Sequence, residues 1–233
     1  MVVLASTRAP AALEHFSGIL GLNKQNGYLI ANSGTIIQES RTGEVIYEQK
    51  LSSDAALLAF DIAHAQGFAV QIYDDDILYT SRTGELTEYD KKITGLRQVV
   101  VDNFRPMVAS GCHKLLISGV PELLEPLTRF LENLIGDVHF HASKPYRLEV
   151  LPPGADKGKA LELIAEKCSI PREAVLAVGD SMNDASMLRF AGYPVAMVNA
   201  DSRLKEMAAL VTQKSNDEDG VAEMIEHYIL GEE

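Results

Sequence analysis

The sequence contains few cysteines, no excess of basic residues and no long apolar run. Its 233 residues include only two cysteines, Cys112 and Cys168, neither in a CxxC or Cys/His spacing, which predicts buried thiols in a reducing compartment, the cytoplasm. The formal net charge of −12 argues against general nucleic-acid binding, which requires clustered Lys and Arg. No apolar run approaches the about 20 residues of a membrane span, and no basic region precedes a cleavable apolar segment. These absences predict a soluble cytoplasmic protein with neither a nucleic-acid partner nor a membrane partner.

The hydrophobic residues, 46% of the total, are enough to build a substantial core, and the length suits one large domain or two modest ones. The outer parts of the chain alternate short apolar strands with amphipathic helices, whereas the middle mixes strand-like alternation with two longer helices near 54–66 and 121–135. We therefore predict an α/β fold in which residues 1–44 and 148–233 form one discontinuous core with a parallel sheet. An inserted α+β domain is expected over residues 45–147.

The outer elements are expected at definite places. The apolar periodicity predicts strands over 2–5, 28–31, 174–178 and 194–197, and helices over 10–20, 156–167, 184–190, 201–208 and from Gly220. The turn Asn32-Ser33-Gly34 follows the second strand.

The most informative segment is VLAVGDSMNDASML, residues 175–188. Its apolar start is typical of a fully buried parallel strand, Gly179 permits a turn, and Asp180, Asn183 and Asp184 follow within one turn before an apolar helical pattern resumes. Ligand sites in open α/β sheets lie at this edge, and Mg²⁺ prefers one or two carboxylates together with waters and a phosphate. A polar turn with an Asp helix cap is the simpler explanation of the same spacing.

Two other polar clusters fit the same edge. Ser6, Thr7 and Arg8 end the first predicted strand, and Lys157 opens a helix in GADKGKALELI. Each has a structural explanation as a cap or a solvated charge, but the three clusters together favour one active site.

In this combination the chain resembles the haloacid dehalogenase superfamily, in particular its Cof-type phosphatases with a type IIB cap. The resemblance rests on ASTR at a strand end, DKGKAL at a helix start and GDSMND at a later turn. The segments KLLISGVPELLEPL, KPYRLEVLPPG, AMVNADSRLKEMA and NDEDGVAEMIE also look like family elements, so the resemblance covers essentially the whole chain. It implies a Rossmann-like core, a mobile cap and hydrolysis of small phosphorylated metabolites through an aspartyl-phosphate.

The resemblance also implies roles for individual residues. Lys157 and Ser6 would be catalytic, and Ser6, Thr7, Arg8, Lys157 and Asn183 would bind the substrate phosphate. Asp180 and Asp184 would hold Mg²⁺ as the cofactor. Cap residues choose the leaving group in this family, and Tyr73 to Asp76 together with Lys144 to Arg147 are candidates for that role.

The family's first motif, DxDGT, does not occur in the sequence. In the family its first Asp is the nucleophile and its second the general acid and base, on a strand in the middle of the core sheet. The segment Asp74-Asp75-Asp76 has the D-x-D spacing, but Gly and Thr do not follow it and it falls in the predicted cap. We therefore expect the chain to be close to inert and its Mg²⁺ binding to be weak, resting on Asp180 with mostly water ligands.

Two functional hypotheses follow from this departure. In the first, the physiological protein is a Mg²⁺-dependent phosphatase and this sequence is a truncated form of it. In the second, the shortened chain has lost catalysis and is a phospholigand-binding or interaction module. In either case we expect one of two repairs of the sheet. The strands at 2–6 and 174–178 pair directly in parallel, or a partner segment, for example from a second copy of the chain by self-association, fills the gap.

His139 and His141 alternate along a predicted strand and share one face. Two ligands are too few for a structural zinc site, so an ordinary strand surface is the preferred interpretation.

Overall fold

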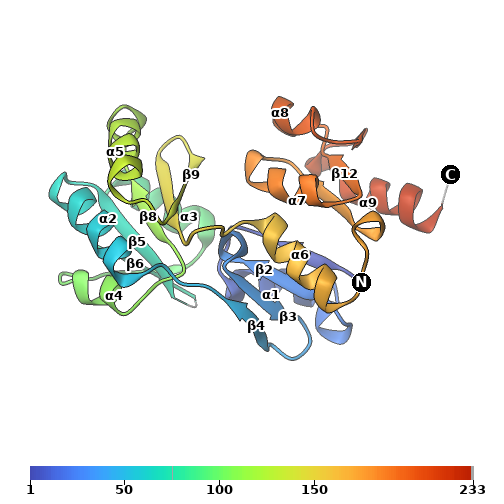
Figure 1. Ribbon diagram of the computed structural model, residues 1–233, viewed down its shortest axis with the longest axis horizontal. Coiled ribbons are helices and arrows are strands. Elements are labelled where there is room, and N and C mark those ends of the chain that lie inside the picture. The colour runs from blue at the N-terminus through green and yellow to red at the C-terminus, as the bar shows by residue number, and fades with distance from the viewer. Residues whose placement is uncertain (75, 232–233) are drawn as a thin grey trace. The chain divides into compact units, whose positions relative to one another are not determined.

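The structure is a computed structural model that describes residues 1–74 and 76–231. The chain divides into two compact units, Met1–Ala155 and Asp156–Glu233, coloured blue to yellow and orange to red in Figure 1. This division by contacts has a single boundary, at 155/156, so the three-segment arrangement with boundaries at 44/45 and 147/148 stays a prediction. Asp75, part of the predicted leaving-group segment, lies outside the described residues.

The first sheet of the first unit is built by the N-terminal residues. Strand β1 (Val3–Ala5) pairs in parallel with β2 (Tyr28–Ala31), and helix α1 (Pro10–Ile19) connects them. Pro10 starts this helix, where its missing N–H costs nothing. A short 3₁₀ turn (Leu22–Lys24) precedes β2, and β3 (Ile36–Glu39) and β4 (Val45–Glu48) then continue the sheet in antiparallel fashion. The predicted helix and both predicted strands of this region are confirmed to within two residues.

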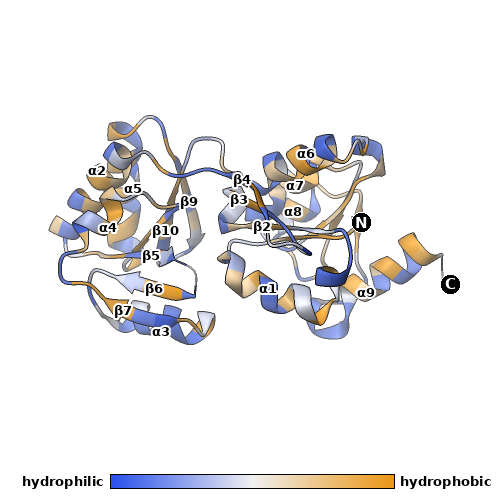
Figure 2. Ribbon diagram, turned by 90° about the horizontal axis from the view of Figure 1, so that it is seen from below, coloured by the Kyte–Doolittle hydropathy of each residue, from blue (hydrophilic) through white to orange (hydrophobic). Residues whose placement is uncertain are grey.

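The second sheet of this unit has six strands in the order β7-β6-β5-β8-β10-β9. The strands are β5 (Ala69–Asp74), β6 (Ile77–Thr80), β7 (Arg97–Val100), β8 (Leu115–Ser118), β9 (His139–Lys144) and β10 (Arg147–Leu151). The helices are α2 (Ser53–Ala65), α3 (Glu85–Thr94), α4 (Arg105–Ala109) and α5 (Pro121–Leu134). The two long helices predicted near 54–66 and 121–135 are thus α2 and α5, and their amphipathic character is visible as alternating blue and orange in Figure 2.

The two faces of this second sheet differ in chemistry. Because successive side chains of a strand point to opposite faces, Ile117 and Leu148 lie on one face, in an apolar core with residues of α2 and α5. The opposite face carries buried polar side chains: Gln71, Ser118, Arg147, Glu149 and, directly before β8, Lys114. Polar groups buried in this way require partners, because an unpaired one costs about 1 to 3 kcal/mol.

The second unit contains a three-stranded parallel sheet. Its strands β11 (Leu176–Gly179), β12 (Tyr193–Ala196) and β13 (Leu210–Val211) are joined through α7 (Ala185–Phe190) and α8 (Ser202–Lys205). Helix α6 (Lys157–Lys167) opens the unit, and α9 (Gly220–Ile225) continues into a π-helical turn (Glu226–Leu230) near its end. Further 3₁₀ turns cover Arg172–Ala174, Met182–Asp184 and Asn216–Glu218.

One predicted helix of this unit is shorter than expected. The pattern predicts a helix over 201–208, but α8 has only four residues. The chain leaves the helix because it must join the sheet: the Ala209 N–H donates to the Pro194 carbonyl at 2.9 Å, directly before β13.

Strands β1 and β11 each lie at the end of their sheet. Strand β1 pairs with β2 and β11 pairs with β12, and the described residues contain no pairing of β1 with β11. Each strand thus has one neighbour in its own sheet, and the direct parallel pairing predicted for these two strands stays a prediction. The alternative, a partner segment beside them, stays a prediction.

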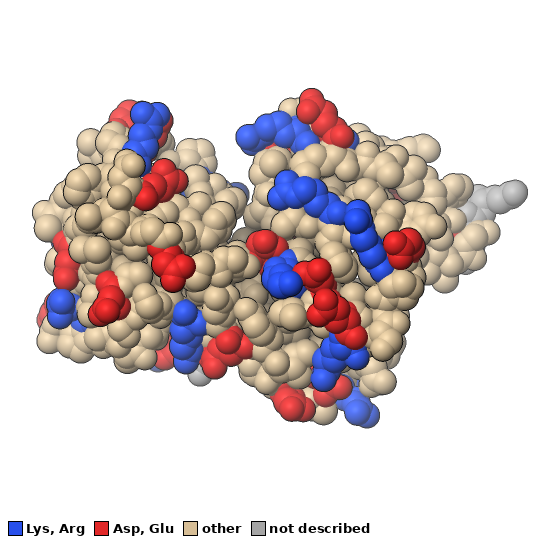
Figure 3. Space-filling model, viewed as in Figure 1, with Lys and Arg blue, Asp and Glu red and all other residues tan. Residues whose placement is uncertain are grey.

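The surface of both units mixes charges of opposite sign. On the face drawn in Figure 3, acidic and basic side chains are interspersed over each unit. Within the described residues, no helix has the length and apolar character needed to cross a bilayer.

Candidate active site

The turn after β11 is the centre of the polar cluster in the second unit. The strand ends at Gly179, where a side chain would not fit, since its Cβ would lie 2.5 Å from the Cβ of Asp184. The Gly179 carbonyl accepts from the Met197 N–H at 2.9 Å, and the Asp180 carbonyl accepts from the Asp201 N–H at 3.0 Å. The turn is thereby fixed to the segment that follows β12.

Asp184 is buried and is saturated with hydrogen-bond donors. Its Oδ2 accepts from the backbone N–H groups of Asp180 at 3.1 Å and of Ser181 at 3.2 Å. Its Oδ1 accepts from the Lys157 ammonium at 2.6 Å, and the two side chains of this ion pair are each 6% exposed. Asp184 therefore anchors the turn and neutralises Lys157.

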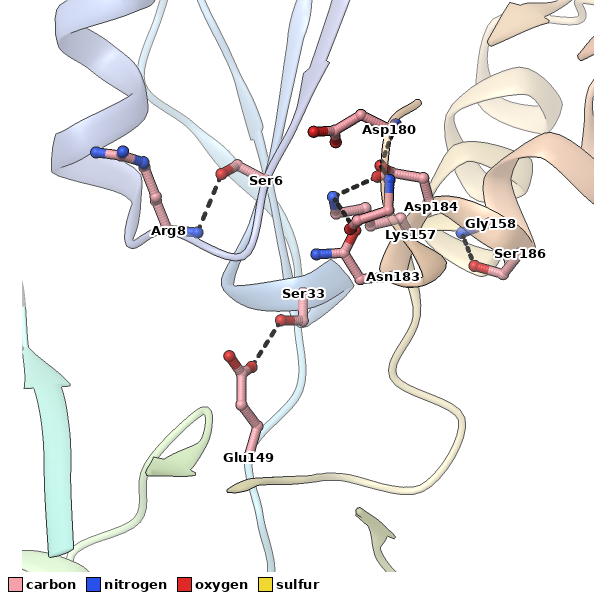
Figure 4. Close-up of polar contacts among 11 residues, drawn as sticks. Ser6, Arg8, Ser33, Glu149, Lys157, Gly158, Asp180, Asn183, Asp184 and Ser186 are labelled. Carbon is pink, nitrogen blue, oxygen red and sulfur yellow. Dashed lines mark hydrogen bonds and ion pairs between the residues drawn. The ribbon is translucent and has the colours of Figure 1, made fainter. Parts of the chain in front are cut away.

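Lys157 stands at the first position of α6. Asp156 caps this helix by accepting the Lys159 N–H at 2.6 Å, and the Lys157 ammonium also lies 3.5 Å from the side-chain oxygen of Asn183. Figure 4 shows Lys157 directed at Asp184 and Asn183. The structure therefore brings these three side chains together, and the roles that the resemblance implies for them stay proposals.

Helix α6 is held close to α7 by the glycine that follows Lys157. The Gly158 N–H donates to Ser186 Oγ at 3.0 Å, and a Cβ on Gly158 would lie 2.4 Å from the Ser186 carbonyl oxygen. Only glycine allows this approach, which sets where the Lys157 side chain starts. Ser186 was not singled out from the sequence, because nothing in its local pattern distinguishes it from an ordinary helix residue.

Asp180 is the exposed carboxylate of the cluster. Partial burial, and then the negative charge of Asp184, raise the pKa of Asp180, while the Lys157 ammonium lowers it by less. Together these influences disfavour the negative charge of Asp180, so its neighbours in the protein do not fully compensate that charge.

The donor set fits a hard divalent cation in part. The Asp180 carboxylate is exposed, whereas both oxygens of Asp184 already accept N–H donors. The described residues contain no group of three or more His, Cys, Asp or Glu side chains that could hold a metal ion. These residues can therefore supply one carboxylate ligand to Mg²⁺, with waters and a phosphate oxygen as the remaining ligands.

We expect Asp180→Asn to abolish most of the divalent-cation binding of the chain. The change removes the only uncommitted carboxylate of the turn while keeping its size and its backbone hydrogen bonds. Binding is measured with Mn²⁺ as the paramagnetic probe, followed by its electron paramagnetic resonance signal.

Asp217→Asn, at an exposed position of the same unit, is the matched control and should leave binding unchanged. A tight stoichiometric site in the unchanged chain, or equal binding by Asp180→Asn, would contradict the assignment.

Ser6, Thr7 and Arg8 form a turn in the first unit. The Arg8 N–H donates to Ser6 Oγ at 3.1 Å, and the Arg8 guanidinium lies 5.9 Å from the centre of the Phe16 ring. The turn is held by the one after β2: the Ser33 N–H donates to the Ser6 carbonyl at 3.1 Å and the Asn32 N–H to the Arg8 carbonyl at 2.8 Å. These residues thus share one turn, and their joint action with the second unit remains a proposal.

The candidate leaving-group residues lie on or beside the six-stranded sheet. Tyr73 is on β5, and burial raises the pKa of its phenol against the opposing influence of nearby Arg147. Arg147 opens β10 and forms an ion pair with the buried Asp90 of α3. Lys144 ends β9 and is exposed. His139 and His141 stack on β9 with ring centres 6.3 Å apart, as expected for neighbours on one strand face.

The sequence reasoning missed Lys114, Glu149 and Ser33, which form a buried network in the first unit. A charge in the middle of an apolar strand, as in RLEVL around Glu149, was the available signal. The sequence predicts Ser33 only as part of the turn Asn32-Ser33-Gly34.

The second unit thus combines a parallel sheet, a carboxylate directly after a strand and a buried lysine at a helix start. The family model described as haloacid dehalogenase-like hydrolase matches residues 1–225, and the chain belongs to this family. Its fold is the Rossmann-like fold of solved haloacid dehalogenase structures. A haloacid dehalogenase-like hydrolase from Bacteroides thetaiotaomicron superposes with a TM-score of 0.90 at 31% identity, covering 97% of this chain and 85% of that one.

Curated relatives of the chain are phosphatases by name. The Bacillus subtilis protein named "Putative phosphatase YxeH" is 30% identical over an alignment of 237 positions that covers 98% of this chain and 86% of the relative. The protein named HMP-PP phosphatase from Yersinia pseudotuberculosis is 28% identical over 214 residues, 91% of this chain and 78% of the relative.

Proposed function

We propose that this chain is a Mg²⁺-dependent phosphatase of the Cof type, whose substrates are small phosphorylated metabolites. The observation that carries the proposal is the buried Lys157–Asp184 ion pair beside the exposed Asp180, at the carboxyl end of a parallel strand, in a member of a hydrolase family. The names of the phosphatase relatives support the substrate class.

The proposed roles follow from the chemistry of each side chain. Lys157 would place a positive charge against the phosphoryl oxygens, and Ser6 would donate its hydroxyl to the same group. Asn183, Thr7 and Arg8 would complete the phosphate contacts. Asp180 would hold Mg²⁺, which when bound neutralises charge on the phosphoryl group and orients it. We assign Asp184 mainly to anchoring Lys157 and the turn.

The alternative is a phospholigand-binding module without catalysis. The observation that favours it is the absence of DxDGT within residues 1–233, since Lys157 and Ser6 can bind and orient a phosphate but the family's nucleophile is an aspartate. We propose that residues 1–233 alone bind phosphate esters and hydrolyse them poorly.

We expect inorganic phosphate to bind the 233-residue chain in the presence of Mg²⁺, as measured by isothermal titration calorimetry. Lys157→Arg keeps the charge but not the point-like geometry of the ammonium and should weaken binding about tenfold, the loss of one good charged contact. Lys159→Arg, two residues further along α6 with an exposed side chain, is the control and should bind as the unchanged chain does. Absence of phosphate binding, or equal binding by Lys157→Arg, would refute the proposed site.

A further inference from the structure

The first unit contains a buried ion pair that the proposed function leaves without a role. The Lys114 ammonium and Glu149 Oε2 are 3.3 Å apart, and their side chains are 3% and 2% exposed. Both side chains lie on the polar face of the six-stranded sheet, Lys114 directly before β8 and Glu149 within β10. Burial alone would raise the pKa of Glu149, but the Lys114 charge and hydrogen bonds lower it, which favours the carboxylate form of this side chain.

Each member of the pair also contacts the neighbouring four-stranded sheet of the same unit. The Lys114 ammonium donates to the Thr7 carbonyl oxygen at 2.7 Å, and the Ser33 hydroxyl donates to Glu149 Oε2 at 3.1 Å. Figure 4 shows the Ser33 hydroxyl directed at the Glu149 carboxylate. The pair therefore reaches both turns that surround Ser6: the Ser6–Arg8 turn itself and the turn that holds it.

The second of these turns has an unfavourable backbone. Asn32, Ser33 and Gly34 have consecutive positive φ angles of 46°, 63° and 100°. Left-handed serine is uncommon and persists only where surrounding contacts impose it. The contacts present are the Ser33 hydroxyl on Glu149 and the Ser33 N–H on the Ser6 carbonyl, so the same residue carries the constraint from Glu149 to Ser6.

Stability does not explain why these two positions are charged. A buried ion pair is often no more stabilising than a well-packed apolar pair of the same volume, because both charges lose their hydration. What an apolar pair could not provide is the pair of outward hydrogen bonds to Thr7 and Ser33. The two charged side chains therefore supply contacts at both turns that an apolar pair would not.

We propose that Lys114 and Glu149 are positioning residues that hold the Ser6-Thr7-Arg8 turn in place from the six-stranded sheet. This inference rests on the proposed function for the importance of Ser6, but the constraint on the turn is independent of it. Functional groups must be held to within about 0.5 Å by supporting residues, and the Lys114 and Glu149 side chains add such support to the backbone hydrogen bonds of the turn. The geometry of Ser6 would thereby depend on two side chains of the six-stranded sheet.

The test is amide hydrogen exchange at the turn, measured residue by residue by NMR in the 233-residue chain. The double variant Lys114→Met/Glu149→Gln removes both charges together, so no uncompensated charge is left in the core. We expect the Arg8 and Ser33 amides to exchange about tenfold faster, the effect of losing a net hydrogen bond or two, while the amides of α2 stay within about twofold. The single variant Lys114→Arg, which keeps a charged donor beside Glu149, should retain most of the protection of the unchanged chain.

The matched control is Lys50→Met/Glu48→Gln, which removes an ion pair of the same unit whose side chains are 49% and 48% exposed, and exchange at Arg8 should not change. Ser33→Ala removes one hydroxyl and no charge, and exchange at Arg8 should rise about threefold. If the double variant does not fold, this single variant decides whether the contact with Glu149 holds the turn. Unchanged exchange at Arg8 and Ser33 in the folded double variant and in Ser33→Ala would overturn the proposal. Exchange in Lys114→Arg as fast as in the double variant would also overturn it.

Phosphate binding gives a second, separate readout. If the unchanged chain binds inorganic phosphate, the double variant should bind about tenfold more weakly, and equal affinity would overturn the positioning role. If the unchanged chain does not bind phosphate, the proposed function fails, while the exchange rates still decide whether Lys114 and Glu149 hold the turn.

Discussion

Residues 1–233 are expected to hydrolyse p-nitrophenyl phosphate in Mg²⁺ about 10⁶-fold more slowly than the same chain preceded by a strand carrying the family's DxDGT motif. Losing a nucleophile costs on this order because the remaining catalytic groups act only together with it. In the proposed site Lys157 and Ser6 would neutralise and orient a phosphoryl group, but neither side chain is the aspartate that the family uses as its nucleophile. Steady-state release of p-nitrophenolate measures both chains.

The control is the extended chain with the first Asp of the motif replaced by Asn, which should return to the rate of residues 1–233. Rapid, Asp180-dependent hydrolysis by residues 1–233 themselves would show that the nucleophile has been assigned wrongly. An extended chain that folds, binds phosphate and still does not hydrolyse it would favour the binding-module hypothesis.

Lys157→Met is expected to lower the free energy of unfolding by about 3 to 5 kcal/mol, the usual cost of removing one partner of a buried ion pair. The side chains of Lys157 and Asp184 are each 6% exposed, so the Asp184 carboxylate would be left with its charge inside the protein. It would retain two backbone N–H donors, from Asp180 and Ser181, but no positive charge. Urea unfolding followed by circular dichroism measures the change.

Two further variants separate the buried charge from lost packing. Lys159→Met, on the same helix with a side chain 54% exposed, should change stability by less than about 1 kcal/mol. Lys157→Met/Asp184→Asn should regain a large part of the loss, because no charge is then left unpaired. A loss below about 1 kcal/mol in Lys157→Met would mean that the pair is hydrated in solution.

Much of the secondary structure could be predicted from the sequence, because apolar periodicity depends on local residues. Strand β2 was predicted at its observed bounds, and helices α2 and α5 to within one residue at each end. The helix expected over 201–208 is the instructive failure, since its helical pattern is overridden by the hydrogen bond of Ala209 to the neighbouring strand. That bond depends on sheet topology, which periodicity does not encode.

The candidate site divides in the same way. The clustering of Lys157, Asn183 and Asp184 was predictable from motifs, because each lies at an element boundary that the sequence marks. The sequence could not predict which carboxylate of the turn is exposed, because Asp180 and Asp184 are both acidic residues of one turn. The structure shows that Asp184 accepts several N–H donors and that Asp180 is exposed. Lys114 and Glu149 are 35 residues apart, and nothing local marks them as partners.

The hydrogen bonds that Asp184 accepts preorganise the turn after β11, residues 180–184. Three donors fix its carboxylate before any ligand arrives, so ordering of the turn occurs during folding and adds little entropy cost on binding. A preorganised charge discriminates by size and shape, because it does not adjust to the ligand. Among tetrahedral oxyanions, affinity should therefore fall with departure from the dimensions of phosphate, and the favourable enthalpy of binding should fall in parallel.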